Sequence, residues 1–279
     1  MKSWLKHTLS IAVTLVYAVL VATSCVQSNF DTPMFVDKEA EVMFNTAIVD
    51  DLATRAWDGR NIDKLYVELY CDNYKVGDRR EYNVTNGSID SFSINLIYGQ
   101  RYTAVFWAQN SSCNAYDISN FKAISILYNS DDIANSDAFY AYCSFTVNDE
   151  TLKNGVDVKL IRPFALIIAG TDSANFDNSA NTTTELTINH VATTFDAFSG
   201  KASGCESKTF SFNPNGTLVP GKVDTVMLGI AYVLPINNAP TSIIIDTTVG
   251  QQTKQTTVNL DKLEGNKRYN IIGNLLPMN

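Results

Sequence analysis

Alternation of apolar and polar side chains recurs along most of this chain and constrains its fold more than any other feature. Residues suited to a buried face occupy every second position in Val42–Ile48, Leu65–Leu69, Phe92–Leu96 and Val156–Leu160. A period of two is typical of a β-strand that packs one face against a core. Because no segment of a dozen residues carries a clean helical stripe, the sequence predicts an all-β fold.

Turn signals separate these runs, and they increase the number of expected strands. Asn86-Gly87, Asn154-Gly155 and Asn215-Gly216 suit the positive φ angles of tight turns. A short helical turn is expected within residues 121–128 or 131–137. Further strand-like runs are Tyr102–Trp107, Phe164–Ile168, Phe210–Phe212, Val226–Leu234, Ile243–Ile245, Val258–Leu260 and Tyr269–Leu276.

The expected strands number roughly a dozen, which exceeds the seven or so of one small β-sandwich. Two sandwiches are therefore the simpler interpretation, with a break near Asn148–Gly155. An N-terminal domain over residues 41–150 and a C-terminal domain over residues 151–279 would each be close to the ~100 residues of a sandwich. The sequence shows no internal repeat.

Residues 1–24 are predicted to be an export signal. A basic start precedes a mostly apolar run over residues 11–22, which is shorter than the about 20 residues of a membrane span and typical of a secretory signal peptide. Val21-Ala22-Thr23-Ser24-Cys25 resembles a bacterial lipobox. We therefore expect lipid attachment at Cys25, followed by a tether over residues 25–40. An ordinary signal peptide with a chance cysteine is the alternative, and the leaflet that the protein faces is left open.

Charge and composition exclude several function classes. The chain has 279 residues and a formal net charge of −8, which disfavours nucleic-acid binding. Its two histidines, His7 and His190, are too few for a multi-histidine metal site. Gly216–Lys222 matches G-x-x-x-x-G-K, but Val223 replaces the Ser or Thr of a phosphate loop. We predict no cofactor, no metal and no enzymatic activity, with a hydrolase of scattered carboxylates as the enzymatic alternative.

The cysteines and the aromatic residues each allow more than one structural role. The four cysteines beyond the lipobox lack C-x-x-C spacing, so they allow either disulfides in one of three pairings or buried thiols. Trp57, Trp107, Tyr140 and Tyr142 could stack on sugars. Trp107 lies in a run that is apolar on both faces, so core packing is expected for it. Trp57 precedes a turn signal and is the candidate exposed aromatic contact. The four cysteines are Cys71, Cys113, Cys143 and Cys205.

Together with the lipobox, three segments resemble the fimbrillin-like lipoproteins, which are pilus-associated proteins of gut and oral anaerobes. They are Asp51–Trp57, Tyr102–Ala108 with the later Leu160–Ala165, and Asn266–Leu276. The resemblance implies two tandem transthyretin-like β-sandwich domains. It also implies a lipoprotein of the outer membrane or cell surface that serves as a structural or accessory subunit of a fimbria and contributes to adhesion.

In polymerising fimbrillins, an arginine-specific protease removes an early strand, and a strand of another subunit fills the groove. Here the resemblance implies cleavage near Arg55, with other fimbrial subunits as partners and the outer membrane held through the lipid on Cys25. Strand addition works because an unpaired sheet edge offers main-chain hydrogen bonds and pockets for alternate side chains. A plain loop arginine is the alternative at position 55. The displaced strand would carry Val42, Phe44, Thr46 and Ile48.

Two further functions stay open. No separate donor strand is evident after Asn274-Leu275-Leu276, so the last strand could itself donate, or the protein could be an uncleaved anchor or accessory subunit. A non-polymerising, glycan-binding surface lipoprotein is the main alternative, with host or bacterial surface glycans or proteins as partners and Trp57 as a contact.

Overall fold

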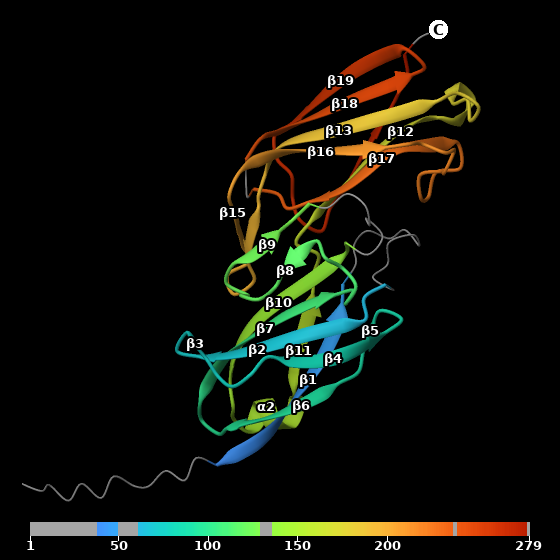
Figure 1. The fold of residues 1–279 in the computed structure, drawn as a ribbon. Coiled ribbons are helices and arrows are strands. Elements are labelled where there is room, and N and C mark those ends of the chain that lie inside the picture. Colours follow the sequence, from blue (N-terminus) through green and yellow to red (C-terminus); the bar gives the residue numbers. More distant parts are fainter. Residues whose placement is uncertain (1–37, 50–60, 129–135, 237–238, 278–279) are drawn as a thin grey trace, which may run out of the picture. The chain divides into compact units, whose positions relative to one another are not determined.

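The computed structural model describes residues 38–49, 61–128, 136–236 and 239–277 (Figure 1). Strands make up most of this part of the chain, and its helical elements are α2 (Asp149–Asn154) and the 3-10 turn η2 (Ser173–Asn175). The all-β prediction is thereby confirmed. Residues Glu39–Asn279 form one compact unit.

The strands between Glu39 and Leu160 that enclose a first hydrophobic core belong to two sheets. They are β1 (Glu39–Ile48), β2 (Lys64–Cys71), β3 (Tyr74–Lys75), β4 (Arg80–Thr85), β5 (Ser88–Ile89), β6 (Phe92–Ile97), β7 (Arg101–Gln109), β10 (Ala138–Thr146) and β11 (Val156–Leu160). One sheet has the order β11-β1-β6, and the other has the order β10-β7-β2-β4-β5, with β3 on β2. Inward side chains such as Phe44, Leu65 and Phe106 fill the space between the sheets.

The strands after Leu160 enclose a second core in the same way (Figure 1). They are β12 (Ala165–Asp172), β13 (Thr182–Val191), β16 (Glu206–Phe212), β17 (Thr225–Val233), β18 (Thr241–Val249), β19 (Gln252–Leu260) and β20 (Arg268–Ile272). Their sheets have the orders β17-β12-β20 and β16-β13-β18-β19. Leu186, Ile188, Ile243 and Ile245 are among the buried residues of this core.

The two sets of strands repeat one arrangement. The first strand of each set lies in the middle of its three-stranded sheet: β1 is antiparallel to β6 and parallel to β11, and β12 is antiparallel to β17 and parallel to β20. The repeat is not visible in the sequence because the two sets share an arrangement without similar residues. By strand pairing, β11 belongs to the first set, so the change between the sets falls after Leu160. The domain division at residues 150 and 151 stays a prediction, since Glu39–Asn279 group as one unit.

A small sheet connects the two sets. Its strands are β8 (Tyr116–Asp117), β9 (Ile124–Ile126), β14 (Thr194–Asp196) and β15 (Lys201–Ser203), in the order β15-β14-β9-β8. No helical turn forms within 121–128, where β9 pairs with β14 instead. Most of the other expected stretch, 131–137, lies outside the described residues. Trp107 from the first set, Phe121 next to β9, and Leu166 and Ile230 from the second set share a third core. This shared core explains why the chain forms one unit.

A buried ion pair lies where the chain passes from β11 to β12. Arg162 is fully buried, and its Nε and Nη2 donate to the two carboxylate oxygens of Asp137 at 2.5 and 2.6 Å. The guanidinium also lies over the Phe139 ring at 4.7 Å and the Tyr232 ring at 5.8 Å. Because a bidentate carboxylate matches the guanidinium fork, the charge can be held inside an apolar core.

Helix α2 was not expected from the periodicity, but its start is encoded locally. The Asn148 side chain accepts from the Thr151 backbone N–H at 3.0 Å, and the Thr151 hydroxyl oxygen lies 3.2 Å from the Asn148 N–H. This reciprocal pair is a capping box. Asp149 and Glu150 in the first turn, and Lys153 in the last, complement the helix dipole. The single turn is too short to show a helical stripe.

We expect Asp137→Asn to lower the free energy of unfolding by about 3–5 kcal/mol, because the Arg162 charge would stay buried without a counter-charge. The measurement is urea denaturation followed by tryptophan fluorescence. Lys262→Ala is the control, since it removes an exposed ion pair to Glu264 at 2.8 Å, and such pairs contribute about 1 kcal/mol or less. Equal effects of the two substitutions would contradict the structural role of the buried pair.

Candidate functional site

The candidate displaced strand, β1, lies in the middle of its sheet (Figure 1). Val42 is opposite Ile94 of β6, and Phe44 is opposite Val156 of β11. Val42 and Phe44 are fully buried, whereas Met43 between them is 50% exposed. Thr46 and Ile48 continue the inward face and are half-buried. The alternation in the sequence therefore identifies the face of β1 that meets the core.

Phe44 is the centre of an aromatic cluster drawn from both sheets. Its ring centroid lies 5.4 Å from that of Phe92 on β6, 5.9 Å from that of Phe106 on β7 and 5.5 Å from that of Phe145 on β10. Aromatic pairs at these separations contribute roughly 0.5–1.5 kcal/mol each beyond the area they bury. One side chain of β1 thus fixes the strand against the opposite sheet.

Polar contacts on the outer face set the register of β1. The Asn45 side chain donates to the Asp157 carboxylate on β11 at 3.0 Å and accepts from the Ser91 hydroxyl, next to β6, at 3.3 Å. Beyond the strand, the Val49 N–H donates to the Leu160 carbonyl oxygen at 2.8 Å. A shift by one residue would break these bonds and turn Phe44 away from the core.

The pairing pattern shows what loss of β1 would expose. Among the described residues, β1 is the strand partner of both β6 and β11, and neither of these pairs with another strand. Adjacent strands lie about 4.8 Å apart, so removal of β1 would leave a gap of roughly 9–10 Å between two unpaired edges. Such a gap accepts one strand that runs antiparallel to β6 and parallel to β11.

Several predicted residues lie outside the described part of the chain. These are the lipidation candidate Cys25, the processing candidate Arg55 and the contact candidate Trp57. Trp107 is fully buried, and its indole N–H donates to the Gln109 side chain at 2.8 Å, which confirms the expected core position. His190 is exposed and has a positive φ of 57° at an irregularity of β13. Within the described part of the chain, no disulfide joins Cys71, Cys113, Cys143 or Cys205.

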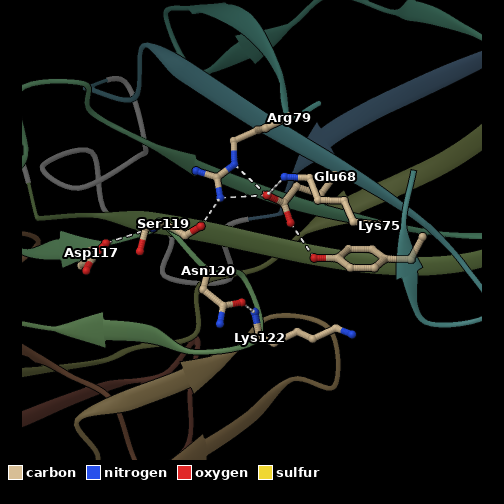
Figure 2. A network of polar contacts seen from close by, with 8 residues as sticks. Glu68, Lys75, Arg79, Asp117, Ser119, Asn120 and Lys122 are labelled. Atoms are coloured by element: carbon tan, nitrogen blue, oxygen red, sulfur yellow. Dashed lines mark hydrogen bonds and ion pairs between the residues drawn. The ribbon is translucent and has the colours of Figure 1, made fainter. Parts of the chain in front are cut away.

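Glu68, a residue that the sequence did not single out, is the centre of a polar cluster (Figure 2). It lies on β2 and is 2% exposed. Its carboxylate accepts hydrogen bonds from the Tyr70 hydroxyl at 2.5 Å, from Lys75 Nζ at 2.8 Å and from Arg79 Nε at 2.9 Å. Burial alone would raise the pKa of Glu68. The hydrogen bonds from Lys75, Tyr70 and Arg79 outweigh this effect, so the pKa of Glu68 lies below its ordinary value of 4.5.

The Glu68 cluster joins β2 and its hairpin to the segment between β8 and β9. Arg79 donates to the Ser119 carbonyl oxygen at 3.2 Å and lies 4.3 Å from the Phe121 ring centroid. Lys122 donates to the Asn73 carbonyl oxygen at 3.1 Å, and its Nζ lies 5.0 Å from the Tyr70 ring. Figure 2 shows Lys75 and Arg79 converging on Glu68, with Arg79 also reaching Ser119. A carboxylate with three donors stays ionised and holds its neighbours, which is not the state of a general acid.

The described ranges contain neither a cluster of metal-ligating side chains nor a membrane-spanning helix. No group of three or more His, Cys, Asp or Glu side chains there has the geometry of a metal site. The helices in these ranges are also too short or too polar to serve as bilayer-spanning segments.

The Glu68 and Asp137 sites could not be found by motif. Their partners are separated in sequence by loops, and a single acidic residue in a strand does not reveal whether it is buried. The one available signal is an acid on an otherwise apolar strand, as in Leu65–Leu69, because such an acid needs a partner.

Comparisons with other proteins identify relatives by sequence and by fold. The sequence profile of a family of unknown function (DUF6562) matches residues 33–279. No curated protein matches the sequence.

Three solved structures with a similar fold come from Bacteroides species. A protein of Bacteroides thetaiotaomicron put forward as polysaccharide-binding aligns with a TM-score of 0.54 and 12% identity, over 84% of this chain and 90% of its own. A candidate cell adhesion protein of Bacteroides uniformis aligns with a TM-score of 0.52 and 11% identity, over 84% and 92%. A candidate adhesin of Bacteroides thetaiotaomicron aligns with a TM-score of 0.51 and 11% identity, over 86% and 94%. Identities this low establish similarity of fold alone.

We expect Glu68→Gln to lower the free energy of unfolding at neutral pH by about 2–3 kcal/mol, because Arg79 and Lys75 lose their charged acceptor. The pKa of Glu68 is lower in the folded protein than its ordinary value of 4.5. Its contribution is therefore complete above the unfolded-state pKa and is lost as the pH falls through the folded-state pKa. The difference in the free energy of unfolding between wild type and variant should become smaller below about pH 4.5.

Urea denaturation at a series of pH values measures this difference. Glu185→Gln, which changes an exposed acid on β13, is the matched control and should stay within about 0.5 kcal/mol of wild type. A stability difference that is the same at neutral and acidic pH would show that the Glu68 charge does not stabilise the cluster.

Proposed function

This chain belongs to a family of unknown function, and we propose that it is a structural or accessory component of a cell-surface fimbria that contributes to adhesion. The observation that carries the proposal is the position of β1. This strand comes first in the compact unit, yet it occupies the centre of a sheet. One cut in the connection to β2 would leave β1 held by non-covalent contacts alone.

We propose that Arg55 is the cut site and that a strand of another subunit then takes the place of β1. Arg55 lies between Ile48, where β1 ends, and Lys64, where β2 begins. Cleavage there would leave the strands from β2 onward on one continuous chain. The incoming strand would gain main-chain hydrogen bonds from β6 and β11 and apolar pockets from the core, which is the physics of strand addition.

Thr46 supplies a reason why another strand could bind better than β1. Its hydroxyl oxygen is buried and has no hydrogen-bond partner among the described residues. An unsatisfied buried hydroxyl costs about 1–3 kcal/mol. A donor strand with an apolar residue at this position would avoid that cost while it filled the pockets of Val42 and Phe44.

The proposed location is the outer membrane, and the proposed partners are other fimbrial subunits. Lipid on Cys25 would hold the precursor at the outer membrane, with two tandem sandwich domains beyond a short tether. The solved structures of similar fold include candidate adhesins and a candidate polysaccharide-binding protein, which supports a surface role. The buried acids Glu68 and Asp137 each pair with a cation, which favours structural over catalytic roles for both. In the anchor form of this proposal, β1 is retained and the protein holds other subunits at the membrane.

We expect two N-termini for the protein on cells: lipidated Cys25 on the precursor and Ala56 on the assembled form. Mass spectrometry of the protein from membranes and from sheared surface filaments measures both. An Arg55→Gln variant, which leaves the strands unchanged, should accumulate as the lipidated form. Detection of lipidated Cys25 alone in every fraction would exclude the polymerising version and leave the anchor version.

We expect Thr46→Val to stabilise the uncut chain by about 1 kcal/mol, because it removes the unpaired hydroxyl without changing shape. It should also slow the exchange of a labelled peptide of residues 38–49 into the chain after a cut at Arg55. Thr187→Val is the matched control, since it removes a hydroxyl that is hydrogen-bonded to Thr209 at 2.7 Å. Equal destabilisation by both variants would show that Thr46 does not weaken β1.

A further inference from the structure

A cavity of about 190 Å³ lies at the passage between the two sets of strands. It is bordered by β10, by the connection from β11 to β12, and by the β14–β15 hairpin. Residues that line it include Tyr140, Ile161, Arg162, Phe195, Gly200 and Leu234. It is smaller than the roughly 300–1,000 Å³ of drug-sized sites, so its size suits a single ring.

Aromatic rings lead from the inside of this cavity to the surface. Phe195 is 3% exposed, and its ring centroid lies 4.6 Å from that of Tyr140 in an edge-to-face arrangement. Tyr142 follows two residues later on β10, so it projects from the same face, and it is 49% exposed. Both tyrosines are among the four aromatic residues considered for stacking on sugars, and neither lies on β1, β6 or β11.

Gly200 keeps the mouth of the cavity open. A Cβ atom at this position would lie 3.0 Å from the Tyr140 hydroxyl oxygen and 3.4 Å from the Tyr142 ring. Its φ of +68° also favours glycine. Any larger side chain would therefore cover the space that the two tyrosines border.

The polar groups of the cavity favour a neutral ligand. The charge of Arg162 is already matched by the two carboxylate oxygens of Asp137, so it is not available to an anion. Tyr140 lines the cavity, and its hydroxyl can both donate and accept a hydrogen bond. A ring with an apolar face and hydroxyl groups at its rim would satisfy both the tyrosine rings and this hydroxyl.

We propose that this cavity is a carbohydrate-binding site for one neutral pyranose ring of a glycan. The sugar ring stacks on Tyr142 at the mouth, and one of its hydroxyls hydrogen-bonds to Tyr140. The site lies outside β1 and its neighbours β6 and β11, so it is present in the uncut chain and does not depend on the fimbrial proposal.

The test is saturation-transfer NMR and calorimetry on the uncut full chain. The probes are the methyl pyranosides of glucose, galactose and mannose, and N-acetylglucosamine. We expect millimolar binding of at least one probe. Tyr142→Ala should weaken this binding about tenfold through loss of the stacking surface, and Tyr140→Phe about fivefold through loss of one hydrogen bond while the ring is kept.

Tyr74→Ala is the matched control, because Tyr74 is a 79% exposed tyrosine on β3, outside the cavity lining. It should leave the affinity unchanged. Near-ultraviolet circular dichroism verifies that each variant is folded, and Tyr140→Phe keeps the packing of the ring. Weaker binding in either cavity variant but not in the control supports the site. Absence of binding by all four probes, or binding that is unchanged in both cavity variants, overturns it.

Discussion

The buried charge of Arg162 is the constraint on which the joining of the two sets of sheets depends. A guanidinium inside an apolar core is tolerated only with a matched counter-charge at close range, and Asp137, 25 residues earlier, provides both oxygens. The pair fixes the approach to β10 against the exit from β11, and Tyr232 of β17 covers it from the other set. With this point fixed, the shared core around Trp107 and Leu166 holds Glu39–Asn279 together.

For β1, the order along the chain and the order in space disagree. A strand at one end of a chain is most simply placed at the edge of a sheet, but β1 is central and carries the aromatic anchor Phe44. Its departure would therefore expose a deep groove rather than a flat edge. The same arrangement recurs at β12, yet β12 lies in the interior of the sequence and no single cut could release it. The two sets thus share a topology while only the first has a strand that one cut could free.

Sequence reasoning succeeded where the signal is local and failed where it is not. Alternation identified the inward residues Val42 and Phe44, because a strand with one buried face repeats every two residues. The parallel pairing of β1 with β11, the Asp137–Arg162 pair and the Glu68 cluster join residues far apart in the chain, and no spacing rule encodes them. Burial determines whether an acidic side chain is solvated or is held by hydrogen bonds and ion pairs, and burial depends on how the sheets assemble. Helix α2 was encoded by its capping box but was too short for periodicity to reveal.

The parallel pairing of β1 with β11 also determines when the first three-stranded sheet can form during folding. Asn45 and Asp157, which bond across this pair, are 112 residues apart, so the sheet cannot close until β11 is available for pairing. During that interval β1 and β6 have free edges, and long-range strand pairing is slow for reasons of loop-closure entropy. Free edges of this kind are prone to pair with other chains.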